Sequence, residues 1–361
     1  MFFKGECCVK KIFLTLIVLL SVFQLSGGAH ARSSLRFAAL GDFQLESGKI
    51  IRQCRIGYRV YGTLNDEKSN AILFPTWFSG TTDDLADFAG PGKLIDTGRF
   101  FLILADSLGN GVSSFPSNSS TQPGKQFPRF SIRDMVTAQH ILLTRKLGID
   151  HLHAVVGISM GGMQTFQWIV SYPGFMDKAV SIAGTPRLTA YDLLLWQTQL
   201  RVMEALEKKD HDKRETMRLI AAIHNLSLQT PEHIVARTPP EELPLFLAAQ
   251  EQYVVRNDFH DWAWQLKAMI GHDIYSTFGG SMERAVSRIK APVLVVVAQQ
   301  DSMVISEPAR NLAATLGAEL VELTGDCGHL AFLCEAEALR FAVTSFLHRG
   351  KKQTIEQIGE N

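Results

Sequence analysis

The 361-residue chain has no excess of positive charge. Lys and Arg together number 36, Asp and Glu also number 36, and the formal net charge is therefore zero. No stretch of the sequence gathers Lys and Arg into a basic stripe. Binding to nucleic acid depends on such a stripe, because it neutralises backbone phosphates. The charge pattern therefore excludes nucleic acid as the expected partner.

Cysteine is scarce, with five in the chain, two of them within the first 31 residues. Beyond residue 31 the chain has three cysteines, Cys54, Cys327 and Cys334. Because three is an odd number, at least one of these thiols is unpaired within the chain. Cys327 and Cys334 flank His329 and could form a bridge, which only geometry decides. We favour buried free thiols for all three.

Long apolar runs are missing outside the N-terminus. There, Lys10 and Lys11 precede the apolar run 12–20, and Ala29 and Ala31 supply the small residues of a cleavage site. The run is short for a membrane span and is typical of a secretory signal peptide over residues 1–31. We expect cleavage after Ala31, export to a bacterial periplasm or beyond, and no stable membrane association of the mature protein.

The sequence is organised around a G-x-S-x-G motif formed by Gly157, Ser159 and Gly161. An apolar run at 154–156 comes before it, and apolar residues at helical spacing follow it. A strand, a sharp turn and a helix in this order are the context of a nucleophile elbow. Ser159 is therefore the predicted nucleophile, held in a strained backbone conformation, and glycines are needed where strand and helix approach closely.

A serine nucleophile that attacks an ester needs two backbone N–H groups to hold the oxyanion. The first is predicted at Met160, because it begins the helix and its N–H has no helical acceptor. The second is predicted in the loop after the buried strand 71–74, at Phe78, with Trp77 as the neighbouring alternative.

A serine hydroxyl also needs a base, and the base needs a carboxylate that orients it. Asp301 follows the apolar strand predicted at 292–298, and His329 follows the strand predicted at 319–323. The chain order Ser159, Asp301, His329 is the order expected when each residue ends a strand. We predict His329 as general base and then acid, with Asp301 as its orienting carboxylate.

Other residues compete for these roles. His272 and Asp273 form an adjacent pair, but in a helical region away from the sheet. Asp326 shares the His329 loop and is an alternative carboxylate. His151 and His153 could pair on one strand face, but no third ligand has useful spacing, so no metal site is expected.

The order of predicted strands and helices indicates an α/β protein with the α/β-hydrolase fold, in which helices flank a mostly parallel central sheet. The core is predicted at 32–185 and 289–348. Helical spacing without strand alternation predicts an inserted helical lid at 186–288. The polar segment 349–361 is predicted to be a flexible tail.

Several segments resemble the homoserine O-acetyltransferase family. They are the elbow, Gly328-His329, and residues 96–101, 107–109, 127–136 and 288–294. The resemblance covers most of the mature chain. It implies an α/β-hydrolase core with a helical lid and an acyl-enzyme on Ser159. It also implies transfer of acetyl from acetyl-CoA to an amino-acid hydroxyl.

The sequence departs from that family at the substrate. In the transferases an aspartate follows the catalytic histidine and helps bind the ammonium group, whereas this chain has Leu330. The arginine expected for the carboxylate has no clear counterpart, with Arg187 and Arg201 as candidates. An unpaired buried ion is costly. We therefore expect a serine-dependent acyl-ester hydrolase that acts on a small-molecule acyl substrate without a cofactor.

Two other functions stay open. One is an O-acyltransferase, for which acetyl-CoA would be a co-substrate. The other is a non-catalytic protein that binds a ligand in the lidded pocket. A homodimer is also left open.

Overall fold

The computed structural model describes residues 32–350, so the predicted signal peptide and all but the start of the predicted tail lie outside the described residues. Within these residues, eight strands form one sheet in the order β1-β2-β4-β3-β5-β6-β7-β8. The β1–β2 and β2–β4 pairings are antiparallel, and the other pairings among the described strands are parallel. The predicted fold class is confirmed. The strands are β1 (Arg36–Gln44), β2 (Ile50–Tyr61), β3 (Ala71–Pro75), β4 (Phe101–Ala105), β5 (Leu152–Ile158), β6 (Met176–Ile182), β7 (Val293–Ala298) and β8 (Glu319–Leu323).

Side chains on the two faces of the sheet form two separate apolar layers. In β5, Val155 belongs to one layer, whereas Ala154 and Val156 belong to the other, because successive strand residues point to opposite faces. The Val155 layer includes residues of α3 (Ile132–Ile141), α4 (Met160–Ser171) and α11 (Glu307–Leu316). The other layer includes residues of α2 (Thr82–Leu85), α12 (Ala331–Cys334) and α13 (Ala336–His348).

Local signals set the bounds of α3. Ser131 and Asp134 form a capping box at its start, because the Ser131 hydroxyl accepts from the Asp134 N–H and the Asp134 carboxylate accepts from the Ser131 N–H. The helix continues as a π-helical segment, η3 (Leu142–Leu147), and ends at Gly148 with φ of 61°. Shorter turns are η1 (Ala86–Phe88), η2 (Gly124–Gln126), η4 (Pro240–Glu242), η5 (Ser276–Phe278) and η6 (Gly328–Leu330).

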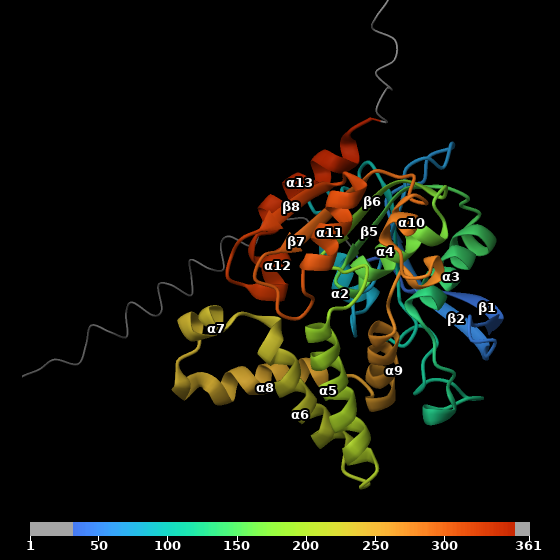
Figure 1. Cartoon of the computed structure of the whole chain (residues 1–361). Helices are drawn as coiled ribbons and strands as arrows, with labels where there is room; N and C mark the ends of the chain where they lie inside the picture. Colours follow the sequence, from blue (N-terminus) through green and yellow to red (C-terminus); the bar gives the residue numbers. More distant parts are fainter. Residues whose placement is uncertain (1–31, 351–361) are drawn as a thin grey trace, which may run out of the picture. The chain divides into compact units, whose positions relative to one another are not determined.

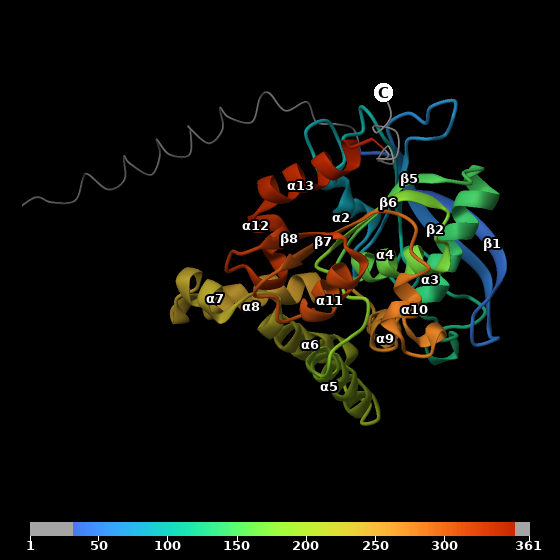
Figure 2. The same cartoon turned by 45° about the horizontal axis from the view of Figure 1, so that its top comes forward.

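Between β6 and β7 the chain forms helices and no strand. Figures 1 and 2 both show α5, α6, α7 and α8 grouped beyond one end of the sheet, on the side away from β1 and β2. We call the helices of this insertion the lid. None of the helices within residues 32–350 has the length and apolar character needed to cross a bilayer. The lid helices are α5 (Ala190–Glu207), α6 (Lys213–Leu228), α7 (Pro231–Arg237), α8 (Leu243–Val254), α9 (Phe259–Ile270) and α10 (Met282–Val286).

A buried carboxyl on α9 ties the lid to the core. Asp261 accepts hydrogen bonds from the Ser117 N–H at 2.9 Å and the Ser117 hydroxyl at 2.7 Å. Burial raises the pKa of Asp261 from 3.8 to about 7. Between these two values the folded chain holds a proton that the unfolded chain has lost. The free energy of unfolding therefore falls as the pH rises from about 4 to about 7.

Replacing this carboxyl should remove part of that pH dependence. The amide introduced by Asp261→Asn can still accept from the Ser117 N–H and donate to the hydroxyl, so we expect the variant to fold. Compared with wild type, it should lose less stability between pH 5 and pH 8, by up to about 3 kcal/mol. Calorimetric unfolding at both pH values measures the difference. Glu241→Gln, which alters an exposed lid carboxyl, is the control; equal pH dependence of all three proteins would refute the assignment.

Candidate active site

Ser159 lies at the turn between β5 and α4, where the backbone is strained. Its φ is 56° and its ψ is −120°, and its N–H donates to the Ile182 carbonyl at 2.8 Å. The two glycines of the motif are required by close packing. A Cβ on Gly157 would lie 2.0 Å from the Gly161 carbonyl oxygen, and one on Gly161 would lie 2.7 Å from the Pro75 carbonyl oxygen. The motif therefore has the geometry of a nucleophile elbow.

The three predicted triad residues meet in one chain of hydrogen bonds. His329 Nε2 lies 2.8 Å from Ser159 Oγ, and His329 Nδ1 lies 2.7 Å from Asp301 Oδ2. The other carboxylate oxygen, Oδ1, accepts from the Met303 and Val304 N–H groups, each at 2.9 Å. The His329 and Asp301 side chains are only 5% and 1% exposed. This arrangement can take a proton from Ser159 and stabilise the resulting imidazolium.

The competing residues are held elsewhere. His272 Nε2 lies 3.0 Å from the Thr185 carbonyl oxygen. Asp326 Oδ1 lies 3.0 Å from His233 Nδ1, so this carboxylate faces the lid helix α7, whereas the carboxylate bonded to His329 Nδ1 is that of Asp301.

His151 and His153 do not share a ligand position either. His151 Nε2 lies 2.9 Å from Asp177 Oδ1, and His153 Nε2 lies 3.0 Å from the Leu347 carbonyl oxygen. Each ring is engaged in its own contact.

The backbone N–H groups predicted for the oxyanion lie at the Ser159 turn and in the loop after β3. Met160 begins α4, so its N–H has no acceptor within the helix. Over residues 32–350 the N–H groups of Trp77 and Phe78 also have no acceptor. The structure thus leaves Met160 and both candidates in the loop available as donors.

Two polar side chains of the lid, which sequence reasoning missed, fix the loops of the site. Gln265 of α9 accepts from the Ser79 N–H at 2.8 Å and thereby holds the loop that contains Phe78. Asp192 of α5 accepts from the Ile305 N–H at 2.9 Å and thereby holds the loop that follows Asp301. The sequence could have predicted that Asp192 caps a helix, since Thr189-x-x-Asp192 is a capping-box pattern. Gln265 had none.

Comparison with known proteins identifies the family of the chain. Residues 77–336 match the family described as alpha/beta hydrolase fold. The chain belongs to this family. A probable esterase of Corynebacterium glutamicum is 32% identical over 86% of this chain and 93% of its own length. A homoserine O-acetyltransferase of Methanococcoides burtonii is 30% identical over 85% of this chain and 72% of its own length. The solved acetyl esterase MekB is 28% identical, with a TM-score of 0.82, over 88% of this chain and 98% of its own.

The resemblance to homoserine O-acetyltransferases inferred from the motifs is therefore confirmed. The chain is also similar to esterases. The chain is an α/β-hydrolase enzyme, and its relatives support ester hydrolysis or acyl transfer as its activity.

A disulfide joins Cys327 to Cys334, so the expectation of free thiols was wrong for these two residues. The turn η6 and the short helix α12 fold the segment back and bring the two Cα atoms to 6.5 Å, a distance that a disulfide can span. The bridge closes the loop that carries His329. Cys54 is free and buried, and burial raises its pKa to about 12, so this thiol stays protonated.

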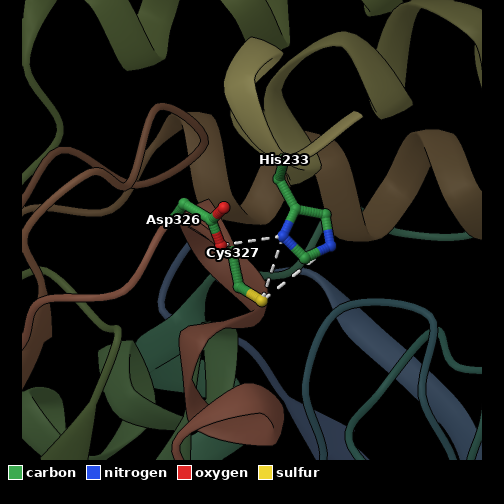
Figure 3. A group of neighbouring side chains, drawn as sticks. All are labelled: His233, Asp326 and Cys327. Atoms are coloured by element: carbon green, nitrogen blue, oxygen red, sulfur yellow. Dashed lines mark hydrogen bonds and ion pairs between the residues drawn. The ribbon is translucent and has the colours of Figure 1, made fainter. Parts of the chain in front are cut away.

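Figure 3 shows His233, Asp326 and Cys327 close together. His233 Nδ1 lies 3.0 Å from Asp326 Oδ1 and 3.4 Å from Cys327 Sγ. These residue types can bind a metal ion, but the Cys327 sulfur is bonded to Cys334 and is not a thiolate ligand. The hydrogen bond from His233 lowers the pKa of Asp326. The cluster is thus a contact between helix α7 and the loop that carries His329.

A pocket of about 290 Å³ opens beside Ser159 between the core and the lid, and no Lys, Arg, Asp or Glu of the described part of the chain lines it. Leu330 lies in its wall. Neither arginine considered for a substrate carboxylate reaches it, since Arg187 packs over the Tyr275 ring and Arg201 is exposed. The lining residues are Trp77, Phe78, Ser79, Ile158, Ser159, Trp196, His224, Asn225, Leu228, Gln250, Tyr253, Val254, Met303, His329, Leu330, Phe332 and Leu333.

Proposed function

We propose that this enzyme hydrolyses short, uncharged carboxylic esters through an acyl-enzyme on Ser159. The observation that carries the proposal is the pocket, which places the Ser159 and His329 side chains in a mainly apolar wall, to which residues 32–350 contribute no carboxylate, ammonium or guanidinium group. A volume of about 290 Å³ suits a small acyl group together with a small alcohol.

Acylation starts with the transfer of the Ser159 hydroxyl proton to His329 Nε2, across the 2.8 Å hydrogen bond. The Ser159 Oγ attacks the ester carbonyl carbon, and the negative charge moves to the carbonyl oxygen. The N–H groups of Met160 and Phe78 stabilise this oxyanion. Asp301 stabilises the imidazolium across 2.7 Å. His329 then gives its proton to the leaving alcohol, and the C–O bond breaks.

Deacylation repeats these steps with water. His329 takes a proton from a water molecule, the hydroxide attacks the acyl carbon, and the same N–H groups hold the second oxyanion. The imidazolium returns the proton to Ser159 Oγ as the acid leaves. Asp301 keeps the Nδ1 proton in place throughout, so Nε2 is free for both steps.

The alternative reaction, acyl transfer to an amino-acid hydroxyl, requires a zwitterion in the same pocket. Its ammonium and carboxylate would be desolvated with no opposite charge beside them, which costs several kcal/mol per ion. Leu330 cannot supply a partner for the ammonium group. We also propose, on the sequence of residues 1–31, that the protein is exported, which would separate it from acetyl-CoA of the cytoplasm.

A pair of acetate esters that differ in charge tests the proposal. We expect kcat/KM for propyl acetate to exceed that for O-acetylhomoserine by at least about 100-fold, because only the second places unpaired charges in the pocket. Acid release followed at constant pH measures both rates. In a parallel assay with acetyl-CoA, homoserine should not accelerate CoA release. Homoserine-dependent release that is faster than ester hydrolysis would establish the transferase instead.

A further inference from the structure

The proposed mechanism requires two N–H groups from separate segments of the chain to meet at one oxygen. The Met160 N–H belongs to the start of α4, whereas the Phe78 N–H belongs to the loop after β3. Both nitrogens have to lie about 2.7–3.1 Å from the oxyanion. A misplacement of about 1 Å in an active site can cost about 100-fold in rate. The separation of the two segments therefore has to be fixed.

The side chain of Gln164, on α4, is fully buried and contacts both segments. Its Nε2 donates to the Met160 carbonyl at 3.2 Å and to the Thr76 carbonyl at 3.0 Å. Met160 carries one of the two N–H groups, and Thr76 begins the loop that carries the other, at Phe78. One amide group thus joins the two sides of the predicted oxyanion site.

Further hydrogen bonds determine which way this amide points. The Trp168 indole N–H, which can only donate, gives its proton to Gln139 Oε1 at 2.9 Å. Gln139 Nε2 is therefore the donor to Gln164 Oε1, at 2.6 Å. The Ser107 hydroxyl donates to the same oxygen at 3.1 Å. With two acceptors at Nε2 and two donors at Oε1, the Gln164 amide uses its full hydrogen-bonding capacity and has one possible orientation.

Thr76 is also held through its side chain. The Ser107 N–H donates to Thr76 Oγ1 at 3.0 Å, and the Thr76 hydroxyl donates to Ser107 Oγ at 3.2 Å. Thr76, Ser107 and Gln164 are each at most 1% exposed, and none of the three lines the pocket. A buried network in which every member is satisfied is rigid. This network therefore holds the loop from behind, without touching a substrate.

We infer that Gln164 is a positioning residue, which sets the separation of the Met160 and Phe78 N–H groups and thereby assembles the oxyanion site. The inference rests on the proposed function, because an oxyanion forms only when Ser159 attacks a carbonyl carbon. Gln164 does not reach the substrate. Its loss should therefore weaken binding of the transition state and leave binding of the ester almost unchanged.

Gln164→Met, which keeps the length of the side chain but removes the amide, tests the inference. For propyl acetate, kcat/KM should fall by about 100-fold, almost wholly through kcat, with KM within about threefold of wild type. The inhibitor 1,1,1-trifluoropentan-2-one gives a second measurement. Ser159 Oγ adds to its carbonyl carbon, the hydroxyl proton passes to His329, and the ketone oxygen becomes an oxyanion. Its inhibition constant should rise by the factor by which kcat/KM falls.

Gln167→Met is the matched control, because it makes the same change at a buried glutamine three residues later on α4. Gln167 donates to the Ser171 hydroxyl of its own helix at 2.7 Å. The control should keep kcat/KM within about twofold of wild type. Gln164→Asn retains the amide but is one methylene too short to reach the Thr76 carbonyl, and it repeats the test if Gln164→Met does not fold.

Three results would overturn the inference. They are a folded Gln164 variant with kcat/KM within about threefold of wild type, an equal loss in Gln167→Met, or an inhibition constant that stays at the wild-type value. Failure of both Gln164 variants to fold would also overturn it, since the residue would then serve stability alone. All of these leave the proposed function intact, because wild type still hydrolyses propyl acetate. The proposed function itself fails when wild type does not.

Discussion

Replacing Ser159 by alanine should lower kcat for hydrolysis of propyl acetate by about 10⁵-fold to 10⁶-fold. The acyl-enzyme cannot form without the Oγ atom, and the remaining rate comes only from substrate binding and the oxyanion donors. His329 Nε2, which lies 2.8 Å from that oxygen, loses the atom from which it takes a proton. Single-turnover and steady-state assays of purified protein measure the loss.

The loss should occur without a change in folding, because the substitution removes one atom and the φ of 56° is imposed by the turn. Thermal unfolding of Ser159→Ala should therefore stay close to that of wild type. Ser276→Ala, a change of an exposed serine outside the pocket, should leave kcat unaltered. Retention of more than a few per cent of wild-type activity by well-folded Ser159→Ala would show that another group attacks the ester.

Asp301→Asn should lower kcat by about 10⁴-fold. The amide oxygen can still accept from the Met303 and Val304 N–H groups, so the loop should keep its shape. The amide nitrogen then faces His329 Nδ1, where a donor meets a donor. The ring is driven to the tautomer with its proton on Nε2, which cannot take the Ser159 proton. Steady-state rates against pH measure the effect, with KM expected to change little.

The matched control is Asp326→Asn, in the loop that carries His329. Because Asp326 faces His233 at 3.0 Å, we expect kcat to stay within about threefold of wild type. A large loss for Asp326→Asn with little loss for Asp301→Asn would reverse the assignment of the carboxylate. Large losses in both would show that the contact of Asp326 with α7 is needed to hold His329 in place.

The elbow could be predicted from the sequence because its causes are local. The apolar run at 154–156, the glycines of the motif and the helical spacing after them determine the turn at Ser159. Asp301 and His329 could then be predicted because parallel strands end at one edge of the sheet, so residues far apart in the chain meet there.

The features that escaped prediction depend on contacts between distant segments. No local sequence pattern predicts that the Gln265 side chain of the lid accepts from the Ser79 N–H. None predicts that α12 brings Cys334 within bonding distance of Cys327. His224 likewise looks like any helical histidine until α5, α6 and α9 pack around it. Side chains that meet only through the packing of lid on core carry no sequence signal of their own.

The central claim is that His329 and Asp301 make Ser159 the one reactive hydroxyl of this chain. Peptide mapping after treatment with a fluorophosphonate probe tests it most directly, with wild type and His329→Ala labelled side by side. We predict a single adduct, on the peptide that contains Ser159, with labelling of His329→Ala slower by at least about 100-fold. An adduct on another residue, or equal labelling of the two proteins, would contradict the account.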